Sequence, residues 1–588
     1  MNVTLRAGND WTSTRIDQYF AVNSASFPAG RLTNLEERTN IFNGDLLVTF
    51  NKEFSEDLRM NLLLGGNLYQ RYDNFTNVVG NGFTIPEFYH LSNTQSQIVT
   101  QFDGRLRRAS LFGRIGFDYK GMIYLNGNIR NDQSTTLPVQ NNSFMYGGAD
   151  LGIILSSLLG LDENGVLPYA KIRASYATVG SDAPIYSLNT PWFRPAAFAD
   201  GWTNGVGFPF RGQNSFLLGG TLGSPDLRPE SRQEWEIGLE LKFFQNMFGI
   251  DITYYNTTNI DQIINVPIAR STGYNFRSVN AAIMENNGLE ILLTGTPIRA
   301  EKPEDFQFDF TVNFSTFNNM VTQLAEGVPN ILLGGFVGSS VRAVAGRPYG
   351  SIFGFPWRRT DDGQLQLDQF GRPQPGGQEI AFGSAIPNWI AGFRPQISVA
   401  GFTLAALLDI RDGGVMWNGT RAAMNFFGTS GESQNRESLD GVIGGVTFVN
   451  NVAQGVLPNG QPNTLPIGTG LPAGRFGPNA SRGQAFFGPA GFYNNFSATL
   501  TEPFIESTSW VRLREVTLSY RFPKAVTDAL VVTRSIELFA TGRNLWLSTD
   551  YMGVDPETSL TGATNAQGLD YFNFPNTKTY TFGIRVGF

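Results

Sequence analysis

The stretch Gln233–Phe243 reads QEWEIGLELKF, with apolar and polar residues in strict alternation. The apolar residues occupy every second position and are Trp235, Ile237, Leu239, Leu241 and Phe243. Because successive side chains of a β-strand point to opposite faces, the pattern predicts a strand with one apolar face and one charged face. A helix would need apolar residues three or four positions apart, so the period of two excludes it here.

The same period of two recurs along the whole chain. Phe306–Phe314, for example, alternates phenylalanine and valine with glutamine, aspartate, threonine and asparagine. About sixteen such segments begin near residues 2, 41, 57, 107, 121, 145, 167, 231, 246, 284, 305, 388, 401, 508, 534 and 577. Many of them alternate over ten residues, whereas strands of soluble sheets usually have about five or six. Strands of that length suit a tilted crossing of a bilayer, in which the apolar face meets lipid and the polar face meets a lumen.

The connections between these segments alternate between short and long. The long ones cover residues 9–41, 70–107, 131–145, 180–231, 262–284, 319–388, 411–508 and 545–577. Short turns at one end and long loops at the other are typical of outer-membrane barrels, and a soluble β-sandwich has no reason for this asymmetry. The sequence therefore predicts an all-β fold over residues 1–588, a transmembrane antiparallel β-barrel with long extracellular loops, notably 180–231, 319–388 and 411–508.

Composition excludes several other classes of protein. The 588-residue chain has no Cys and one His, which excludes disulfides, iron–sulfur clusters and multi-histidine metal centres. Its net charge of −7 has the wrong sign for a nucleic-acid-binding surface. The longest apolar run, Leu151–Leu161, falls short of the roughly 20 residues of a spanning helix. Because no catalytic motif occurs, we predict no enzymatic activity, no metal and no cofactor.

The last residues form an alternating strand that ends on an aromatic ring. Its apolar positions are Tyr580, Phe582, Ile584, Val586 and Phe588. One interpretation is simply a further amphipathic strand. We favour a second, in which these residues form the C-terminal insertion signal of an outer-membrane barrel, because an aromatic girdle belongs at that depth.

Polar residues on the opposite face of the strands are candidates for the lumen. They are Glu234, Glu236, Glu240, Arg108, Arg114, Asp309 and Lys242. They could line a path for substrate, although such residues more often keep a barrel interior hydrated and mutually paired.

Several short motifs along the chain form a consistent series. Ser224–Glu230 (SPDLRPE) is followed by Glu234–Gly238 (EWEIG), and near the end come Trp510–Tyr520 (WVRLREVTLSY) and Thr549–Glu557 (TDYMGVDPE). These segments resemble motifs of the SusC/RagA family of TonB-dependent outer-membrane transporters. The resemblance runs in family order from about residue 40 to the end.

The resemblance implies a barrel of 22 strands, of which this chain would hold the last sixteen. It also implies a bacterial outer-membrane location in contact with lipid, and TonB-driven import of oligosaccharides or peptides. In the family a plug domain and a region that contacts TonB precede the barrel, and we expect neither within this sequence, which could be a gene fragment, a truncated paralogue or one half of a split receptor. A SusD-like surface lipoprotein is the expected partner, in assemblies that are often dimers of SusC–SusD pairs.

One loop, residues 191–216, combines aromatic rings with arginines. Flat aromatic faces stack on sugar rings or hold peptide side chains, and arginines bind polar groups beside them. The candidate substrate-binding residues are Trp192, Phe193, Arg194, Trp202, Phe208, Phe210 and Arg211. The alternative is that these rings pack the loop against its neighbours.

Residues 412–508 form the longest connection, rich in Gly, Asn, Ser and Pro. A connection of that length without regular structure is usually functional or disordered. In the family, long outer loops contact the surface lipoprotein. The candidate contact residues are Trp417, Phe426, Phe427, Phe486, Phe487 and Phe492.

Two other functions remain open. Sixteen strands can close by themselves as a passive porin. The chain could also be a receptor-like scaffold subunit of a larger outer-membrane complex. If the sixteen strands do not close, the first and last leave edges that hydrocarbon does not tolerate, and other strands must pair with them.

Overall fold

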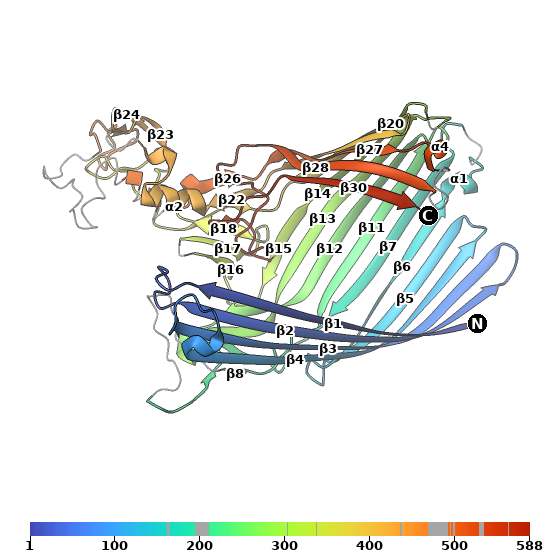
Figure 1. Ribbon diagram of the computed structural model, residues 1–588, viewed down its shortest axis with the longest axis horizontal. Coiled ribbons are helices and arrows are strands. Elements are labelled where there is room, and N and C mark those ends of the chain that lie inside the picture. The colour runs from blue at the N-terminus through green and yellow to red at the C-terminus, as the bar shows by residue number, and fades with distance from the viewer. Residues whose placement is uncertain are drawn as a thin grey trace.

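A single large sheet dominates the structure (Figure 1). The computed structural model describes the chain except for residues 162–164, 194–210, 303, 337, 435–437, 468–491, 494–495, 498–499, 528–533, 563 and 588. The sheet has 18 strands, but β10 (Thr221–Leu222) has only two residues, and β15 (Asn318–Leu324) continues β14 (Gln307–Thr316). Sixteen strands therefore run along the sheet.

These strands pair antiparallel with their neighbours in chain order. Besides β14 with its continuation β15, they are β1 (Asn2–Phe20), β2 (Arg31–Glu53), β3 (Leu58–Phe83), β4 (Thr94–Tyr119), β5 (Ile123–Ser134), β6 (Ser143–Ile154), β7 (Tyr169–Ser181), β11 (Glu230–Phe243), β12 (Phe248–Pro267), β13 (Phe276–Ile298), β20 (Trp389–Val399), β21 (Phe402–Asp412), β27 (Trp510–Arg521), β28 (Ser535–Thr549) and β30 (Thr579–Gly587). The prediction of an all-β fold with about sixteen antiparallel strands is confirmed.

The register keeps apolar residues together on one face of the sheet. Trp235 lies opposite Tyr176 and Asn256 of the two neighbouring strands, and Ile237 lies opposite Ala174 and Tyr254. The rings of Trp235 and Tyr254 pack with their centroids 5.4 Å apart. Because the side-chain period is two, a slip by one residue would turn this whole apolar set to the charged face, so the register is strongly specified.

The first four strands are longer than the sequence predicted. Residues 9–41 and 70–107 were expected to be loops, but β3 and β4 have 26 residues each and pair from Leu58 opposite Tyr119 to Phe83 opposite Thr94. A bilayer crossing needs about 9–11 residues, so these strands continue far beyond the hydrocarbon. Outside lipid both faces of a strand can be polar, and the alternation that marked the strands in the sequence ends there.

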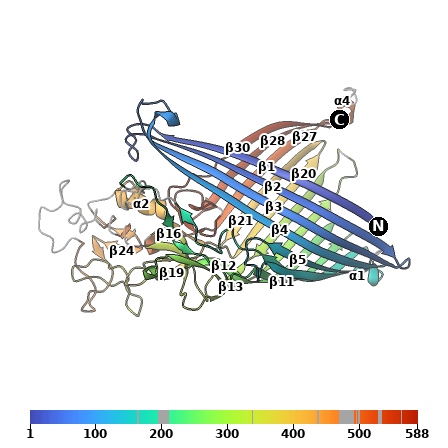
Figure 2. The same ribbon diagram turned by 90° about the horizontal axis from the view of Figure 1, so that it is seen from below.

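The long and short connections lie at opposite ends of the sheet (Figures 1 and 2). The short-turn end carries both chain ends together with two single-turn helices, α1 (Leu155–Leu158) and α4 (Lys524–Thr527). None of the described helices is long and apolar enough to cross a membrane. The long-loop end carries the 3-10 helices η1 (Leu91–Asn93) and η2 (Arg270–Thr272), and the strand pair β8 (Trp192–Phe193) and β9 (Leu217–Leu218).

The two outermost strands of the sheet are not joined to each other. β1 pairs with β2, and β30 pairs with β28. Within the described part of the chain no register connects β1 with β30, and Figure 1 shows the two strands apart. The sheet is thus a curved wall with two edges, and each edge presents backbone N–H and C=O groups without a strand partner.

Three long connections fold together into one packed unit, which we call the loop body: the described residues of 325–388, 413–509 and 550–578. It contains three small sheets, the helix α2 (Gly419–Phe427), and the 3-10 helices η3 (Gly431–Ser433) and η5 (Glu502–Phe504). The sheets consist of β16 (Ile331–Phe336), β17 (Ser339–Ala343), β18 (Ser351–Gly354) and β19 (Ile380–Ser384); of β22 (Val415–Asn418), β26 (Ile505–Ser507) and β29 (Leu569–Asp570); and of β23 (Gly441–Ile443), β24 (Val446–Val449) and β25 (Val452–Ala453).

The loop body has a hydrophobic core of its own. Ile352, Phe448, Phe504 and Leu569 are almost completely buried and come from all three connections. Phe496 stacks on Phe504 with ring centroids 5.6 Å apart. The described part of 412–508 is therefore ordered by contacts with residues distant in the sequence.

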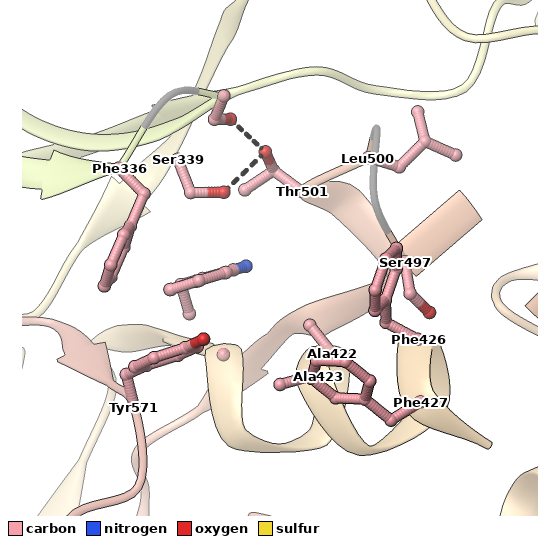
Figure 3. A pocket seen from close by; sticks show the side chains of 13 residues that line it. Phe336, Ser339, Ala422, Ala423, Phe426, Phe427, Ser497, Leu500, Thr501 and Tyr571 are labelled. Carbon is pink, nitrogen blue, oxygen red and sulfur yellow. Dashed lines mark hydrogen bonds between the residues drawn. The ribbon is translucent and has the colours of Figure 1, made fainter. Parts of the chain in front are cut away.

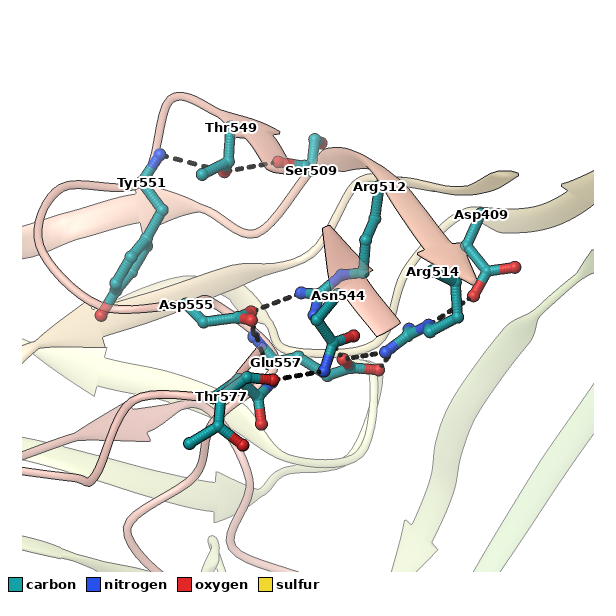
Figure 4. Close-up of polar contacts among 11 residues, drawn as sticks. Asp409, Ser509, Arg512, Arg514, Asn544, Thr549, Tyr551, Asp555, Glu557 and Thr577 are labelled. Atoms are coloured by element: carbon teal, nitrogen blue, oxygen red, sulfur yellow. Dashed lines mark hydrogen bonds and ion pairs between the residues drawn. The ribbon is translucent and has the colours of Figure 1, made fainter. Parts of the chain in front are cut away.

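Ion pairs attach the loop body to the wall (Figure 4). The Arg512 side chain of β27 is 1% exposed, and its Nη2 lies 2.5 Å from Oδ1 of Asp555. Two positions along, Arg514 binds both carboxylate oxygens of Glu557 and also Asp409 of β21, at 2.7–2.8 Å. Burial raises the pKa of Asp555, but hydrogen bonds from Arg512, the Glu557 N–H and Asn576 outweigh it and hold this pKa below its usual value.

We predict that Arg512→Met loosens the loop body from the wall. Removal of one partner leaves the Asp555 carboxylate buried without its cation, which typically costs about 3–5 kcal/mol. The measurement is the rate of proteolytic cleavage within 413–467 in detergent-solubilised protein. Arg585→Met is the matched control, because Arg585 is 69% exposed beside Glu537, and an exposed pair contributes about 0–1 kcal/mol.

Two further results follow from the same contact. The double variant Arg512→Met, Asp555→Asn should recover much of the resistance to proteolytic cleavage, because it leaves no unpaired charge buried at this contact. Folding lowers the pKa of Asp555, so the stability that its charged carboxylate gives to the folded protein is complete when the pH is above the ordinary aspartate range. This stability is lost as the pH falls through the lowered pKa. Equal cleavage rates for Arg512→Met and Arg585→Met would contradict the anchoring role.

Candidate functional site

The charged residues predicted for the lumen are largely paired with each other or with close neighbours. Lys242 lies 3.4 Å from Glu240, and Glu234 accepts hydrogen bonds from Arg232 and Thr257. A pairing that the sequence did not reveal joins Arg173 to both carboxylate oxygens of Asp251, at 2.6 and 3.1 Å. This polar face therefore carries ion pairs within a strand, such as Lys242 with Glu240, and between strands, such as Arg173 of β7 with Asp251 of β12.

The aromatic loop 191–216 falls only partly within the described residues. Trp192 and Phe193 form β8, pair with β9, and expose 66% and 46% of their surface. Arg211 lies in a turn with φ of 50°. Arg194, Trp202, Phe208 and Phe210 lie outside the described residues. The two described rings are accessible to a ligand, and their role in substrate binding stays a prediction.

The predicted partner contacts divide into two groups. Trp417 and Phe492 are 8% and 6% exposed and belong to the core of the loop body, so the structure assigns them to packing instead of to a contact surface. Phe426 and Phe427, at the C-terminal end of α2, are exposed and pack edge to face at 5.0 Å. Phe486 and Phe487 lie outside the described residues. The sequence could not separate these groups, because Trp417 is buried by residues from other connections.

The C-terminal residues form the last strand of the sheet. The strand β30 pairs with β28 and exposes the side chains of Tyr580, Phe582, Ile584 and Val586. Phe588 lies outside the described residues. The exposed apolar row agrees with a membrane-facing strand, and its use as an insertion signal stays a prediction.

Helix α2 is fixed at both ends by its own sequence. The Asn418 side chain accepts a hydrogen bond from the Arg421 N–H at the N-terminus, and Gly428 ends the helix with φ of 69°. The Arg421 guanidinium binds Glu432 and, from Nη1, Glu506 at 3.0 Å. The sequence analysis did not find this cluster of ion pairs, because its three residues come from separate parts of the connection. The one local signal in the sequence was the spacing of Asn418 and Gly428, which indicates the helix that carries Arg421.

A cavity of about 260 Å³ lies between α2, the β16–β17 hairpin and the residues Leu500 and Thr501 that precede η5 (Figure 3). Phe336, Trp417 and Tyr571 form an aromatic cluster in its lining, with Phe336 centred 5.4 Å from Trp417 and 4.9 Å from Tyr571. Ser339, Ser497 and Thr501 add hydroxyl groups, and Phe426 and Phe427 complete the apolar lining. The cavity thus combines flat rings with hydroxyls and has no charged side chain among its lining residues.

The Asp570 carboxylate joins helix α2 to the segment that contains Tyr551. Its carboxylate accepts hydrogen bonds from Thr420 of α2 at 3.0 Å and from the Tyr551 hydroxyl at 3.1 Å. Burial raises the pKa of Asp570, and burial together with the nearby Asp570 charge raises that of Tyr551. The tyrosine therefore remains a proton donor at neutral pH, which suits a fixed structural contact.

The chemistry of these residues is that of binding. Within the described residues no group of three or more His, Cys, Asp or Glu side chains could hold a metal ion. The strongest polar arrangements are closed ion pairs that stabilise the fold. The exposed side chains at the long-loop end include the aromatic rings of Trp192, Phe193 and Phe427 as well as charged groups such as Arg270 and Arg358.

Known proteins with similar sequences are named TonB-dependent receptors. The chain matches the family model "TonB dependent receptor-like, beta-barrel" over residues 2–545. It is 24% identical to the TonB-dependent receptor P26 of Formosa agariphila, covering 94% of this chain and 53% of that protein. It is 19% identical to the TonB-dependent receptor SusC of Bacteroides thetaiotaomicron, covering 83% and 44% respectively. The chain thus spans about half the length of the curated relatives it matches.

A solved structure, that of the RagAB peptide transporter, shares the fold. It superposes with a TM-score of 0.72 at 19% identity and covers 99% of this chain and 60% of that one. The resemblance to SusC and RagA inferred from sequence motifs is thereby confirmed, as are the barrel fold and the outer-membrane location. The relatives are receptors and transporters, in agreement with a chain that is not an enzyme. This chain belongs to the TonB-dependent receptor β-barrel family.

Proposed function

We propose that the chain forms the wall and the outer loops of a TonB-dependent importer of the SusC/RagA type. The observation that carries this proposal is the family match over residues 2–545, together with the ordered loop body at one end of a sixteen-strand wall. A passive pore needs no large packed unit at its mouth, whereas an importer that captures its cargo does.

The orientation follows from the family's architecture. The long-loop end, with the loop body and the extended β1–β4 strands, faces the outside, and the short-turn end faces the periplasm. The plug and the TonB-contacting region belong to polypeptide N-terminal to these residues. Further strands of the same barrel fill the opening between β1 and β30, because an unpaired edge in hydrocarbon costs several kcal/mol for each backbone group.

The cargo is an oligosaccharide or a peptide, bound at the long-loop end before it enters the barrel. A SusD-like surface lipoprotein covers that end as a lid, and two such pairs form a dimer. The name of one similar structure, a RagAB peptide transporter, supports the peptide alternative for the cargo. The exposed pair Phe426 and Phe427 is the described surface best suited to the lipoprotein, because exposed adjacent aromatics are typical anchors of interfaces.

We predict that uptake through this protein stops when the inner-membrane proton gradient is collapsed. Cells with and without the gene would be supplied with a labelled oligosaccharide mixture and a labelled peptide mixture, before and after addition of a protonophore. Uptake of one mixture should depend on both the gene and the gradient, because TonB draws its energy from that gradient. Gene-dependent uptake that continues without the gradient would establish a porin, and the absence of any gene-dependent uptake would favour a scaffold.

We predict that Phe427→Ser reduces co-purification of a surface lipoprotein by about tenfold, which corresponds to roughly 1.4 kcal/mol. The reason is the loss of an exposed aromatic anchor. The readout is the amount of lipoprotein recovered with the full chain from outer membranes, measured by mass spectrometry. Val442→Ser is the control, because Val442 is 73% exposed in the separate sheet that contains β23. Equal losses in both variants would place the lipoprotein contact elsewhere.

A further inference from the structure

The outward face of β4 changes from apolar to charged at Arg107. Between the short-turn end and that point the outward residues of the strand are all uncharged: Tyr119, Phe117, Ile115, Gly113, Leu111 and Ala109. This stretch matches the roughly 9–11 residues with which a strand crosses hydrocarbon. Arg107 is the next residue on the same face, so it lies at the level where the strand leaves the bilayer.

The neighbouring strands change character at the same level. Gln70 of β3 lies opposite Arg107, and Phe42 of β2 lies opposite Gln70. One row closer to the short-turn end, Leu68 of β3 lies opposite Ala109. An aromatic ring and polar side chains next to an apolar band are typical of the boundary between hydrocarbon and lipid headgroups.

A hollow of about 640 Å³ lies at this boundary, on the neighbouring strands β2 to β5 and beside the connection from β5 to β6 (Figure 2). It exists because Ala109 is smaller than Leu68 and Gln133, which lie opposite it on the two adjacent strands. Phe42 and Val139 extend the apolar lining, and Leu68 and Val139 are 61% and 88% exposed. A recess with exposed apolar walls is suited to a hydrocarbon chain.

The Arg107 side chain lines this hollow without a carboxylate partner. Its Nε donates a hydrogen bond to Oε1 of Gln70 at 3.1 Å, and it forms no ion pair with any described residue of the chain. The next residue, Arg108, points to the opposite face and is paired with Asp182 at 2.7 Å. Both Nη groups of Arg107 can therefore bind an anion from outside the chain.

A second cation lies further toward the long-loop end on the same face. Arg105 is two positions beyond Arg107, and its Cζ lies 5.6 Å from the centroid of the Tyr72 ring. Asp103 is the nearest acidic residue along this face of β4, and its carboxylate accepts hydrogen bonds from Tyr72 and Asn74 at 2.6 and 2.7 Å. The side of the hollow nearest the long-loop end is therefore positively charged at Arg107.

Other strands are neutral at the corresponding level. In β11 the outward residue that follows Trp235 toward the long-loop end is Gln233. Gln233 lies opposite Thr178 of β7 and Thr258 of β12, which are also uncharged. A positive charge at the membrane boundary is thus a local feature of β4 and not a general property of the wall.

We propose that the hollow binds a membrane lipid with a phosphate in its headgroup, from the leaflet nearest the long-loop end. One acyl chain lies along Leu68 and Ala109, and the phosphate binds Arg107. A guanidinium binds two phosphate oxygens at once, and lipids place phosphate at this depth. A dissolved anion would leave the apolar recess unused, and a neutral lipid would leave Arg107 without a counter-ion.

This lipid site goes beyond the proposed import function, and its test needs neither cargo nor TonB. The experiment is native mass spectrometry of the full-length protein in detergent micelles, titrated with three probes. Dimyristoyl phosphatidic acid has both acyl chains and a phosphate, dimyristoylglycerol has the chains alone, and inorganic phosphate has the anion alone. We expect phosphatidic acid to bind the wild type more tightly than either of the other two.

The first pair of variants tests the phosphate contact. Arg107→Gln should weaken the binding of phosphatidic acid by about fivefold, the usual contribution of one arginine beside an anionic lipid surface. Binding of dimyristoylglycerol should stay unchanged in this variant. Arg59→Gln is the matched control, because the Arg59 side chain is 63% exposed beside Glu53, close to the short-turn end and outside the hollow.

The second pair tests the apolar recess. Ala109→Phe should fill the hollow and weaken the binding of phosphatidic acid while Arg107 remains in place. Leu111→Phe is its control, because Leu111 is 72% exposed on the same face of β4 and does not line the hollow. If Ala109→Phe fails to fold, Arg107→Gln against Arg59→Gln still decides the question.

The proposal is overturned if Arg107→Gln binds phosphatidic acid as tightly as Arg59→Gln does. It is also overturned if the wild type binds dimyristoylglycerol as tightly as phosphatidic acid, since the phosphate would then contribute nothing. Displacement of phosphatidic acid by an equal concentration of inorganic phosphate would reduce the hollow to a simple anion site and would contradict the assignment to a lipid.

Discussion

Backbone hydrogen bonding within lipid is the constraint on which the rest of this structure depends. Hydrocarbon offers no partner to an N–H or C=O group, so a chain without spanning helices can cross it only as strands that pair with one another. The continuous antiparallel order from β1 to β30 meets this condition between neighbours, and the alternation seen in β11 turns one face to lipid and the other to the lumen. At the two edges of the sheet, β1 and β30 each have one side without a strand partner for their backbone groups. For this reason we assign further strands to these edges.

The loop body obeys a different rule, because it stands outside lipid. Its segments are poor in regular structure, and it is ordered by a core to which three long connections contribute. Its position on the wall is then set by a few buried charges, above all Arg512 with Asp555. A packed unit of this kind can hold a shaped cavity between α2, β16–β17 and the residues Leu500 and Thr501, which a set of independent loops could not.

The sequence predicted the wall well and the loop body poorly, for a physical reason. Strands such as β11 and β14 carry the period-two pattern in consecutive residues, so about sixteen strands and their short turns were visible. Strands β1–β4 were predicted too short, because their outer halves leave lipid and lose the alternation. The cavity could not be foreseen, since Phe336, Trp417 and Tyr571 meet across more than two hundred residues. Trp417, taken as a surface contact, is buried by partners that no local pattern reveals.

The central claim, that this wall is part of a larger barrel, is tested most directly by cysteine cross-linking in native outer membranes. These 588 residues contain no cysteine, so a disulfide within them can join only the two introduced residues. Leu5→Cys in β1 would be combined in turn with Cys at Thr581, Phe582, Gly583 or Ile584 of β30. The positive control is Leu5→Cys with Leu46→Cys, because these residues lie opposite each other in β1 and β2. We expect the control pair to cross-link and none of the β1–β30 pairs to do so. A β1–β30 disulfide as efficient as the control would show that sixteen strands close on themselves, and would contradict the account.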